Sequence, residues 1–179
     1  MYFLLEMELG LFVLHCLYFF LPAYIANMMP VFVKKIPLFD FPIWESKLGS
    51  HKTWRGLFFG TLGSGLVFWV QQVLYKHGFQ SLALIDYSDF TVLFGFLLGL
   101  GALLGDLVKS YYKRKADIAP GQPWIPFDQI DFVIGALVVG FLVYVPPIEV
   151  VLVLLVVSPV LHLLVNYIGY LLGINKKKW

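Results

Sequence analysis

The sequence has little charge and almost no cysteine. Asp, Glu, Lys and Arg make up only 13% of its 179 residues, whereas a soluble domain carries about a quarter. Hydrophobic residues make up 60%, and the mean hydropathy is +0.82. A water-soluble fold of this length has too little interior to bury so many apolar side chains, so a soluble globular domain is excluded. The one cysteine, Cys16, lies in an apolar segment, which excludes an internal disulfide and predicts a small core residue.

Strong basic excess, internal repeats and a cleavable leader are also missing. The formal net charge is +2, and no basic tract alternates with aromatic residues, so nucleic acid is not an expected partner. Glu6 and Glu8 stand where a secretory signal peptide is basic, and no small-residue cleavage site is evident. The amino-terminal apolar segment is therefore predicted to be a membrane span. Together these features predict an all-α integral membrane protein with one domain, residues 1–179.

Five apolar segments approach the length of about 20 residues that a helix needs to cross a membrane. The predicted spans are residues 9–29, 57–75, 92–108, 132–147 and 148–173. Pro146 and Pro147 separate the last two, because proline interrupts helical hydrogen bonding. The third and fourth spans are short, so their helices are expected to continue into the polar segment between them.

The basic residues predict the orientation of these spans. All but one of the 13 Lys and Arg residues lie in residues 30–56, in residues 106–131 or in the carboxyl-terminal tail. Because basic loops stay in the cytoplasm, the amino end is predicted to lie outside and the carboxyl end inside. Residues 30–56 and 109–131 then form two polar cytoplasmic loops in a cell-membrane protein. The first mixes aromatic residues, Pro and Lys, which is typical of a segment lying along the lipid headgroups.

The second loop begins with charged residues at helical spacing. If the third span continues as a helix past Gly105, five polar residues share one face. They are Asp106, Lys109, Ser110, Lys113 and Asp117, flanked by Arg114 and Lys115. The simplest interpretation is a solvated helix end with local ion pairs. However, a carboxylate near the membrane boundary, such as Asp106, is costly unless it is paired or bound to a metal.

Two further acids, Asp128 and Asp131, open the fourth span three residues apart, on one helical face. They are consistent with caps of a helix amino terminus, where acids also favour the helix dipole. With Asp106 they place three carboxylates around one loop. Hard oxygen ligands of this kind suit Mg²⁺, especially beside substrate phosphates.

A third polar stretch, "GSHKTWRG" at residues 49–56, leads into the second span. Its Lys52 and Arg55 are three residues apart, and Thr53 adds a hydroxyl. The stretch lacks the glycine spacing of a Walker A loop, which leaves phosphate contacts or membrane anchoring as its role.

Inside the spans the main polar residues are His15, Asn27, His162 and Asn166. Asn27 is a candidate site residue because it lies near the cytoplasmic end of its span. His162 and Asn166 share a face, and either interhelical hydrogen bonding or a place in the site fits them.

These motifs resemble those of a known enzyme family. Gly105-Asp106-Leu107, then Ser110, Lys113-Arg114 and a distal Asp128-x-x-Asp131, resembles the signature of membrane CTP:phosphatidate cytidylyltransferases. The chain departs from that signature where Gln129 replaces an Arg and where "PGQPWIP" replaces a His-Gly-Gly segment. Its small size and its "KTWRG" and "PFDQIDF" motifs are closer to the archaeal branch, the CDP-archaeol synthases.

The resemblance implies a reaction and a set of site residues. It implies transfer of CMP from CTP to 2,3-di-O-geranylgeranylglyceryl phosphate, an isoprenoid ether lipid phosphate, with Mg²⁺ and with release of pyrophosphate. The expected catalytic residues are Asp106, Asp128, Asp131 and Lys109, of which the three acids would hold the metal. The expected CTP or lipid phosphate contacts are Lys52, Thr53, Arg55, Ser110, Lys113, Arg114, Lys115 and Asn27. Asp117 is expected to be either a ligand or an ion-pair partner.

One alternative belongs to a different class: a membrane transporter or channel with a charged cytoplasmic vestibule. It predicts polar groups near the bilayer midplane, often in repeated halves, whereas the charges here gather at one interface. A CDP-alcohol phosphotransferase is disfavoured because its DGxxAR motif is absent.

Overall fold

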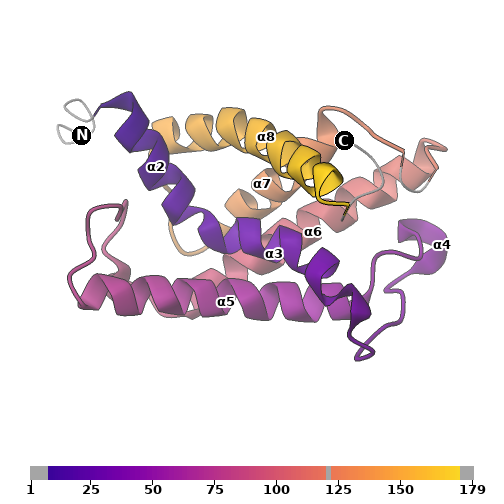
Figure 1. Ribbon diagram of the computed structural model, residues 1–179, viewed down its shortest axis with the longest axis horizontal. Coiled ribbons are helices and arrows are strands. Elements are labelled where there is room, and N and C mark those ends of the chain that lie inside the picture. The colour runs from indigo at the N-terminus through magenta and orange to yellow at the C-terminus, as the bar shows by residue number, and fades with distance from the viewer. Residues whose placement is uncertain (1–7, 120–121, 174–179) are drawn as a thin grey trace.

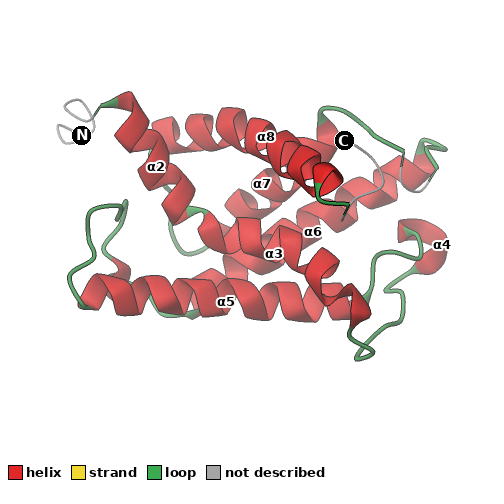
Figure 2. Ribbon diagram, viewed as in Figure 1, coloured by secondary structure: helices red, strands yellow, loops and turns green. Residues whose placement is uncertain are grey.

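The computed structural model describes residues 8–119 and 122–173, and its regular structure there is helical apart from one isolated bridge (Figures 1 and 2). The α-helices are α2 (Leu9–Phe19), α3 (Leu21–Phe32), α4 (Glu45–Leu48), α5 (Trp54–Lys76), α6 (Leu93–Lys115), α7 (Phe127–Gly140) and α8 (Ile148–Leu171). Two short 3₁₀ helices are η1 (Val33–Lys35) and η2 (Tyr87–Asp89). The all-α prediction is confirmed for these residues. Glu6 and the three lysines of the tail lie outside them.

Three helices, α5, α6 and α8, are long and apolar enough to cross a membrane. The consecutive helices α2 and α3 pass the same test together, but they are bent by 56°, so they add a fourth span only if the bent pair counts as one. With 14 residues, α7 is shorter than a full span. A multi-pass membrane protein is therefore supported, while the number five stays a prediction.

The helices of the structure begin and end at other residues than the predicted spans do. The first span is not one straight helix: Phe20 leaves the helical conformation, and Pro22 follows in the first turn of α3. Because proline has no N–H and its ring collides with the carbonyl four residues before it, the chain bends here. The helix α3 then continues through residues 30–32, which the sequence predicts to be part of a loop. At the other end, α7 stops at Gly140, so residues 141–147 are not helical.

The centre of the bundle is α6, which packs against α3, α5 and α7 (Figure 1). Three glycines, Gly101, Gly105 and Gly135, line its contact with α7. A Cβ atom at Gly105 would collide with the backbone carbonyl of Asp131, and one at Gly135 with that of Gly101. Small residues allow such close backbone approach in membranes. The contact brings the amino-terminal turn of α7 beside the carboxyl-terminal half of α6.

We expect Gly105→Ala to destabilise the protein by about 1–3 kcal/mol, because the added methyl group must force α6 and α7 apart. The measurement is the thermal unfolding midpoint in detergent. The matched control is Gly10→Ala, since a Cβ at Gly10 meets nothing within 4 Å. Equal midpoints for the two variants would contradict the close contact.

Candidate functional site

Six charged side chains from three parts of the chain meet at one end of the bundle. We call them the charge cluster: Lys52, Asp106, Lys109, Lys113, Asp128 and Asp131. Lys109 lies at the centre of the cluster. Its Nζ atom is 3.2 Å from Asp106 Oδ1, 2.8 Å from Asp128 Oδ1 and 3.0 Å from Asp131 Oδ2. Only 14% of the Lys109 side chain is exposed. Its one ammonium group therefore pairs with three mostly buried carboxylates away from bulk water.

Two further lysines extend the cluster on either side. Lys113 Nζ donates to both carboxylate oxygens of Asp128, at 3.0 and 2.9 Å. On the other side, Lys52 Nζ donates to Asp106 Oδ2. The charges thus alternate along the site. The helix α6 continues to Lys115. This confirms the prediction that Asp106, Lys109 and Lys113 lie at helical spacing on a continuation of the third span.

The two acids of α7 lie in its amino-terminal turns, before the apolar segment, and their pKa values shift in opposite directions. Burial and the neighbouring Asp106 carboxylate raise the pKa of Asp131 to about 6. Burial would also raise the pKa of Asp128, but hydrogen bonds from Lys109 and Lys113 outweigh it and lower that pKa. Asp128 is therefore fully ionised near neutral pH, whereas Asp131 is the carboxyl group of α7 that is more easily neutralised.

A polar cavity of about 250 Å³ opens beside the cluster. One wall consists of cluster residues, and the others carry uncharged polar side chains. These are Asn27 of α3, Gln129 of α7, and His162 and Asn166 of α8. His162 and Asn166, for which the sequence left two roles open, both line this cavity. The prediction for Asn27 is consistent with its position.

An apolar groove of about 510 Å³ adjoins this cavity between α3 and α8. It shares Asn27, Asp106, His162 and Asn166 with the polar cavity, and its other lining is mostly apolar, including Val31, Val165 and Leu172. A molecule with a charged head and apolar chains fits such a junction, because the head and the chains each meet surroundings of matching polarity.

The comparisons with known proteins identify the family. A family model described as CarS-like, CDP-archaeol synthase, matches residues 9–179. The chain belongs to the CDP-archaeol synthase family. It is 38% identical to the CDP-archaeol synthase of Pyrococcus furiosus, over 93% of this chain and 95% of that protein. The CDP-archaeol synthase of Methanocaldococcus jannaschii is 36% identical, over 91% of this chain and 95% of that protein.

A solved structure agrees with this assignment. It is described as an intramembrane enzyme for archaeal membrane lipid biosynthesis, and it is 28% identical with a TM-score of 0.66. The match covers 84% of this chain and 91% of that one. Membership of the CDP-archaeol synthase family confirms the predicted resemblance and, with it, a CTP-dependent cytidylyltransferase of archaeal lipid synthesis. None of these relatives is described as a transporter.

The metal predicted for this family can be tested against the donor set. Three carboxylates suit Mg²⁺ chemically. Their spacing, however, suits the ammonium of Lys109, at 2.8 to 3.2 Å, rather than a metal that takes oxygens at about 2.0–2.1 Å. Within residues 8–119 and 122–173, no three His, Cys, Asp or Glu side chains form a metal-binding group as they stand. The residues fit Mg²⁺ if Lys109 leaves the centre of the carboxylates.

Several predicted phosphate contacts lie elsewhere in this member of the CDP-archaeol synthase family. Arg55 pairs with Asp40 and donates to the Ile36 carbonyl, away from the cluster. The Thr53 hydroxyl accepts the Gly56 N–H, which caps α5. Ser110 is buried on α6 and does not line the polar cavity.

Two basic residues at the end of α6 are also outside the cluster. The Arg114 guanidinium donates to the Ile118 carbonyl, and Lys115 is exposed. Neither residue lines the polar cavity. Thr53 lines a small pocket with Lys52 and Asp106. Arg55, Ser110, Arg114 and Lys115 line neither that pocket nor the polar cavity, so their geometry gives no support to the expected phosphate contacts.

Asp117 does not share the charged face of α6, because the helix ends at Lys115. Asp117 has a φ of 57°, and its N–H donates to the Arg114 carbonyl at 3.1 Å. The next N–H, of Ile118, donates to the Lys113 carbonyl at 3.0 Å, which completes a Schellman motif. Asp117 also makes no ion pair within the described part of the chain.

We expect Asp117→Gly to retain wild-type synthesis within about twofold and to stabilise the protein by up to about 1 kcal/mol. Glycine adopts this left-handed conformation without the steric penalty of a side chain. CDP-lipid formation and the unfolding midpoint would be measured together. A tenfold loss of synthesis would restore Asp117 as a ligand.

Gln129 is a buried cavity residue that sequence reasoning missed. It is only 4% exposed, its Oε1 atom has no hydrogen-bond partner, and it lines the polar cavity. The sequence marked it only as a departure from a family motif. The sequence did contain a local signal for Gln129. Glutamine is mostly exposed in folded proteins, and this one follows Asp128 in the first turn of an apolar helix.

Proposed function

We propose that the protein transfers CMP from CTP to 2,3-di-O-geranylgeranylglyceryl phosphate, giving CDP-archaeol and pyrophosphate at a site facing the cytoplasm. The observation that carries this proposal is the junction of the charge cluster with the apolar groove between α3 and α8. The lipid phosphate would lie in the polar cavity, with Asn27 and Asn166 at the boundary. Its isoprenoid chains would lie in the groove.

The reaction requires electrostatic stabilisation of phosphate charge and does not require a general base. A lipid phosphate oxygen attacks the α-phosphorus of CTP, and the bond to the β-phosphate breaks, so that pyrophosphate leaves with the electron pair. A phosphomonoester has a second pKa of about 6, so the nucleophile is mostly ionised at neutral pH. What remains is to bring two anions together and to stabilise the leaving group.

The lysines of the cluster suit that task. Lys52, Lys109 and Lys113 come from two separate segments and all face the cavity or its rim. Their ammonium groups would bind phosphate oxygens and stabilise the charge on pyrophosphate. Asp106, Asp128 and Asp131 would hold Mg²⁺, which when bound neutralises phosphate charge. Lys109 would then exchange its carboxylate partners for phosphate.

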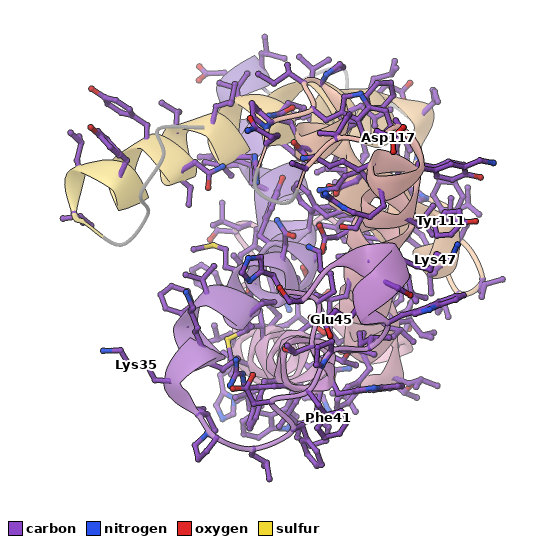
Figure 3. All side chains as sticks on the ribbon, turned by 90° about the vertical axis from the view of Figure 1, so that its right-hand side faces the viewer. Lys35, Phe41, Glu45, Lys47, Tyr111 and Asp117 are labelled. Carbon is purple, nitrogen blue, oxygen red and sulfur yellow. The ribbon has the colours of Figure 1, made fainter. Side chains whose placement is uncertain are left out.

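The position of the cluster supports the cytoplasmic assignment. The amino end of α5, the carboxyl end of α6 and α4 lie at the same end of the bundle (Figure 1). Figure 3 views this end, with Lys35, Lys47 and Asp117 among the labelled residues. The basic residues of both predicted cytoplasmic loops therefore gather at the end that holds the site.

The test is direct. Detergent-purified protein would be incubated with Mg²⁺, labelled CTP and the geranylgeranyl ether lipid phosphate, and the products separated for a CDP-lipid. Diacyl phosphatidate is the parallel substrate, and the lipid alcohol without phosphate is the negative control. Product with the ether lipid phosphate supports the proposal. No product with either phosphate, together with substrate flux into vesicles without CTP turnover, would favour the transporter.

A further inference from the structure

We propose that Asp40 and Arg55 are positioning residues that act through Lys52. They hold residues 36–53, here called the return segment, against the start of α5, so that Lys52 reaches the charge cluster. This inference deepens the proposed function, because it rests on Lys52 being a lysine of the phosphate site. It also gives Arg55 a role other than the phosphate contact that the sequence suggested.

The first step is the set of contacts made by Arg55. Its side chain is only 8% exposed. One guanidinium nitrogen, Nη2, lies 2.8 Å from Asp40 Oδ1, and the other, Nη1, donates to the Ile36 carbonyl oxygen at 2.6 Å. The planar fork of a guanidinium group suits two partners at fixed angles. Arg55 thus joins the first turn of α5 to two points near the start of the return segment.

The second step is the backbone hydrogen bonding between the return segment and the start of α5, beside the Arg55 side-chain contacts. The Arg55 N–H donates to the Phe39 carbonyl at 2.9 Å, and the Trp54 N–H donates to the Phe41 carbonyl at 3.2 Å. These are amide groups at a helix start, which have no partner inside the helix. The return segment therefore supplies the acceptors that α5 needs.

The third step links this pairing to Lys52. Residues Pro42 and Thr53 form an isolated antiparallel bridge. Beside it, the Ile43 N–H donates to the Lys52 carbonyl at 2.8 Å. The main chain of Lys52 is thus hydrogen-bonded to the part of the return segment that follows Asp40.

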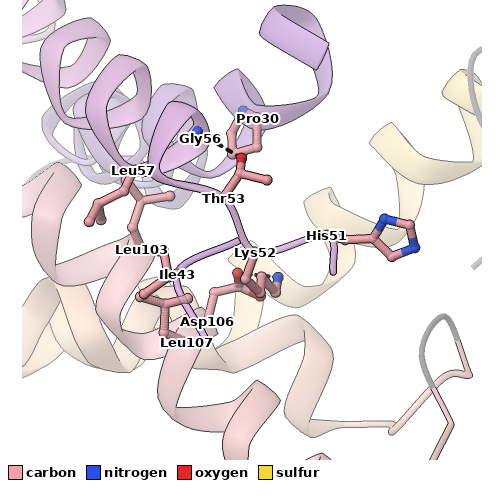
Figure 4. Close-up of a pocket in the computed structure, with 10 residues that line it drawn as sticks. All are labelled: Pro30, Ile43, His51, Lys52, Thr53, Gly56, Leu57, Leu103, Asp106 and Leu107. Carbon is pink, nitrogen blue, oxygen red and sulfur yellow. Dashed lines mark hydrogen bonds and ion pairs between the residues drawn. The ribbon is translucent and has the colours of Figure 1, made fainter. Parts of the chain in front are cut away.

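The last step is the reach of the Lys52 side chain. Figure 4 shows Lys52 directed at Asp106, while the neighbouring His51 points away from it. Lys52 has a long stem with many rotamers, so its position depends on where its main chain is fixed. Phe39, just before Asp40, has a φ of 55°, a conformation that persists only when its surroundings impose it. Its carbonyl is the one that the Arg55 N–H binds.

A direct role for Arg55 fits the geometry less well. Arg55 lines neither the polar cavity nor the small pocket between Lys52 and Asp106. To touch a phosphate in the cluster it would have to give up both Asp40 and the Ile36 carbonyl. A buried cation that loses its partners is strongly unfavourable.

The experiment is a double-mutant cycle on CDP-lipid synthesis with Lys52→Ala, Arg55→Ala and the double variant. We expect each single variant to lower kcat/KM by up to about 100-fold, because a small misplacement of a site group has an effect of that order. In the Lys52→Ala background, Arg55→Ala is expected to change kcat/KM less than about twofold, since its effect passes through Lys52. Losses that multiply would show that Arg55 touches substrate itself and would overturn the proposal.

A second measurement does not depend on activity or on the stability of the Arg55 variant. In Asp40→Asn, hydrogen exchange at the Ile43 and Arg55 amides is expected to become at least tenfold faster, while Asp40→Glu restores protection. Asp86→Asn is the matched control, because Asp86 is an exposed acid outside the return segment whose side chain accepts the nearby Ser88 N–H. Unchanged exchange in Asp40→Asn would overturn the proposal. If the wild type makes no CDP-lipid, the proposed function fails, and this exchange result alone decides whether the pair holds Lys52 in place.

Discussion

Replacing Lys109 with Met is expected to reduce CDP-lipid synthesis by about 10²–10³-fold. Lys109 is the one cation that contacts Asp106, Asp128 and Asp131 together within the described residues. Methionine keeps a similar length but removes the charge, so the site loses the ammonium proposed to bind phosphate and gains uncompensated negative charge. Removing one preorganised group that stabilises transition-state charge costs an enzyme an amount of this order.

The same variant is expected to respond more strongly to Mg²⁺ without substrates. Loss of the partner of a buried charge destabilises a protein by about 3–5 kcal/mol, so the unfolding midpoint of Lys109→Met is expected to fall. Mg²⁺ would recover more of that midpoint than it adds to the wild type, because the three carboxylates have lost the ammonium that they share. Both effects are read from thermal unfolding in detergent with and without Mg²⁺.

The control for Lys109 is Lys76→Met, an exposed lysine at the far end of α5. It is expected to keep wild-type synthesis and stability. Synthesis by Lys109→Met within tenfold of the wild type would contradict the central role of Lys109. An equal response to Mg²⁺ in the variant and the wild type would contradict the proposal that the carboxylates around Lys109 bind the metal.

The variants Asp128→Asn and Asp131→Asn are each expected to lower synthesis by about 10²–10³-fold, but to differ in stability. The pKa of Asp128 is lowered, so the folded state favours its ionised form. The neutral amide introduced by Asp128→Asn cannot supply that stabilisation of the folded state. The pKa of Asp131 is raised to about 6, so the folded state already favours the neutral form. We therefore expect Asp128→Asn to lower the unfolding midpoint and Asp131→Asn to lower it little.

This pair of variants separates a catalytic role from helix capping. Asp128 Oδ2 accepts the Trp124 N–H just before α7, and Asp131 Oδ1 accepts the Phe132 N–H inside it, so both acids also bind backbone near the start of the helix. If capping were their whole role, both variants would keep synthesis near the wild-type rate at a temperature where they are folded. Asp89→Asn, an exposed acid in η2 at the opposite end of the bundle, is the control.

Composition and local spacing are enough to predict the class of the protein and which helical faces carry the charge cluster. Low charge and long apolar segments leave few folds other than a bundle of membrane helices, because unpaired backbone groups are too costly in lipid. Within that bundle, Asp106, Lys109 and Lys113 follow a helical period, and Asp128 and Asp131 follow another. Each set is therefore placed on one face by its spacing. The family motifs contain both sets, which predicts that the two faces belong to one site.

Tertiary contacts determine which polar side chains are free to act. Arg55 and Thr53 look equivalent to Lys52 in sequence, yet each satisfies backbone or carboxylate groups around the start of α5. Asp117 follows the helical period of α6, but the helix ends before it. Backbone groups that need partners compete for nearby side chains, and the outcome depends on where the chain turns.

The remaining cavity residues could not be related to one another from the sequence because they lie far apart along the chain. Asn27, Gln129 and His162 reach one cavity from three helices, and no local pattern relates them. The contact that brings Gln129 beside α6 depends on glycines of α6 and α7 at which a single methyl group would not fit. Sequence periodicity reports which face of a helix is polar. Only the packing of α3, α7 and α8 around α6 determines which polar faces meet, because that depends on backbone approach between segments far apart in the chain.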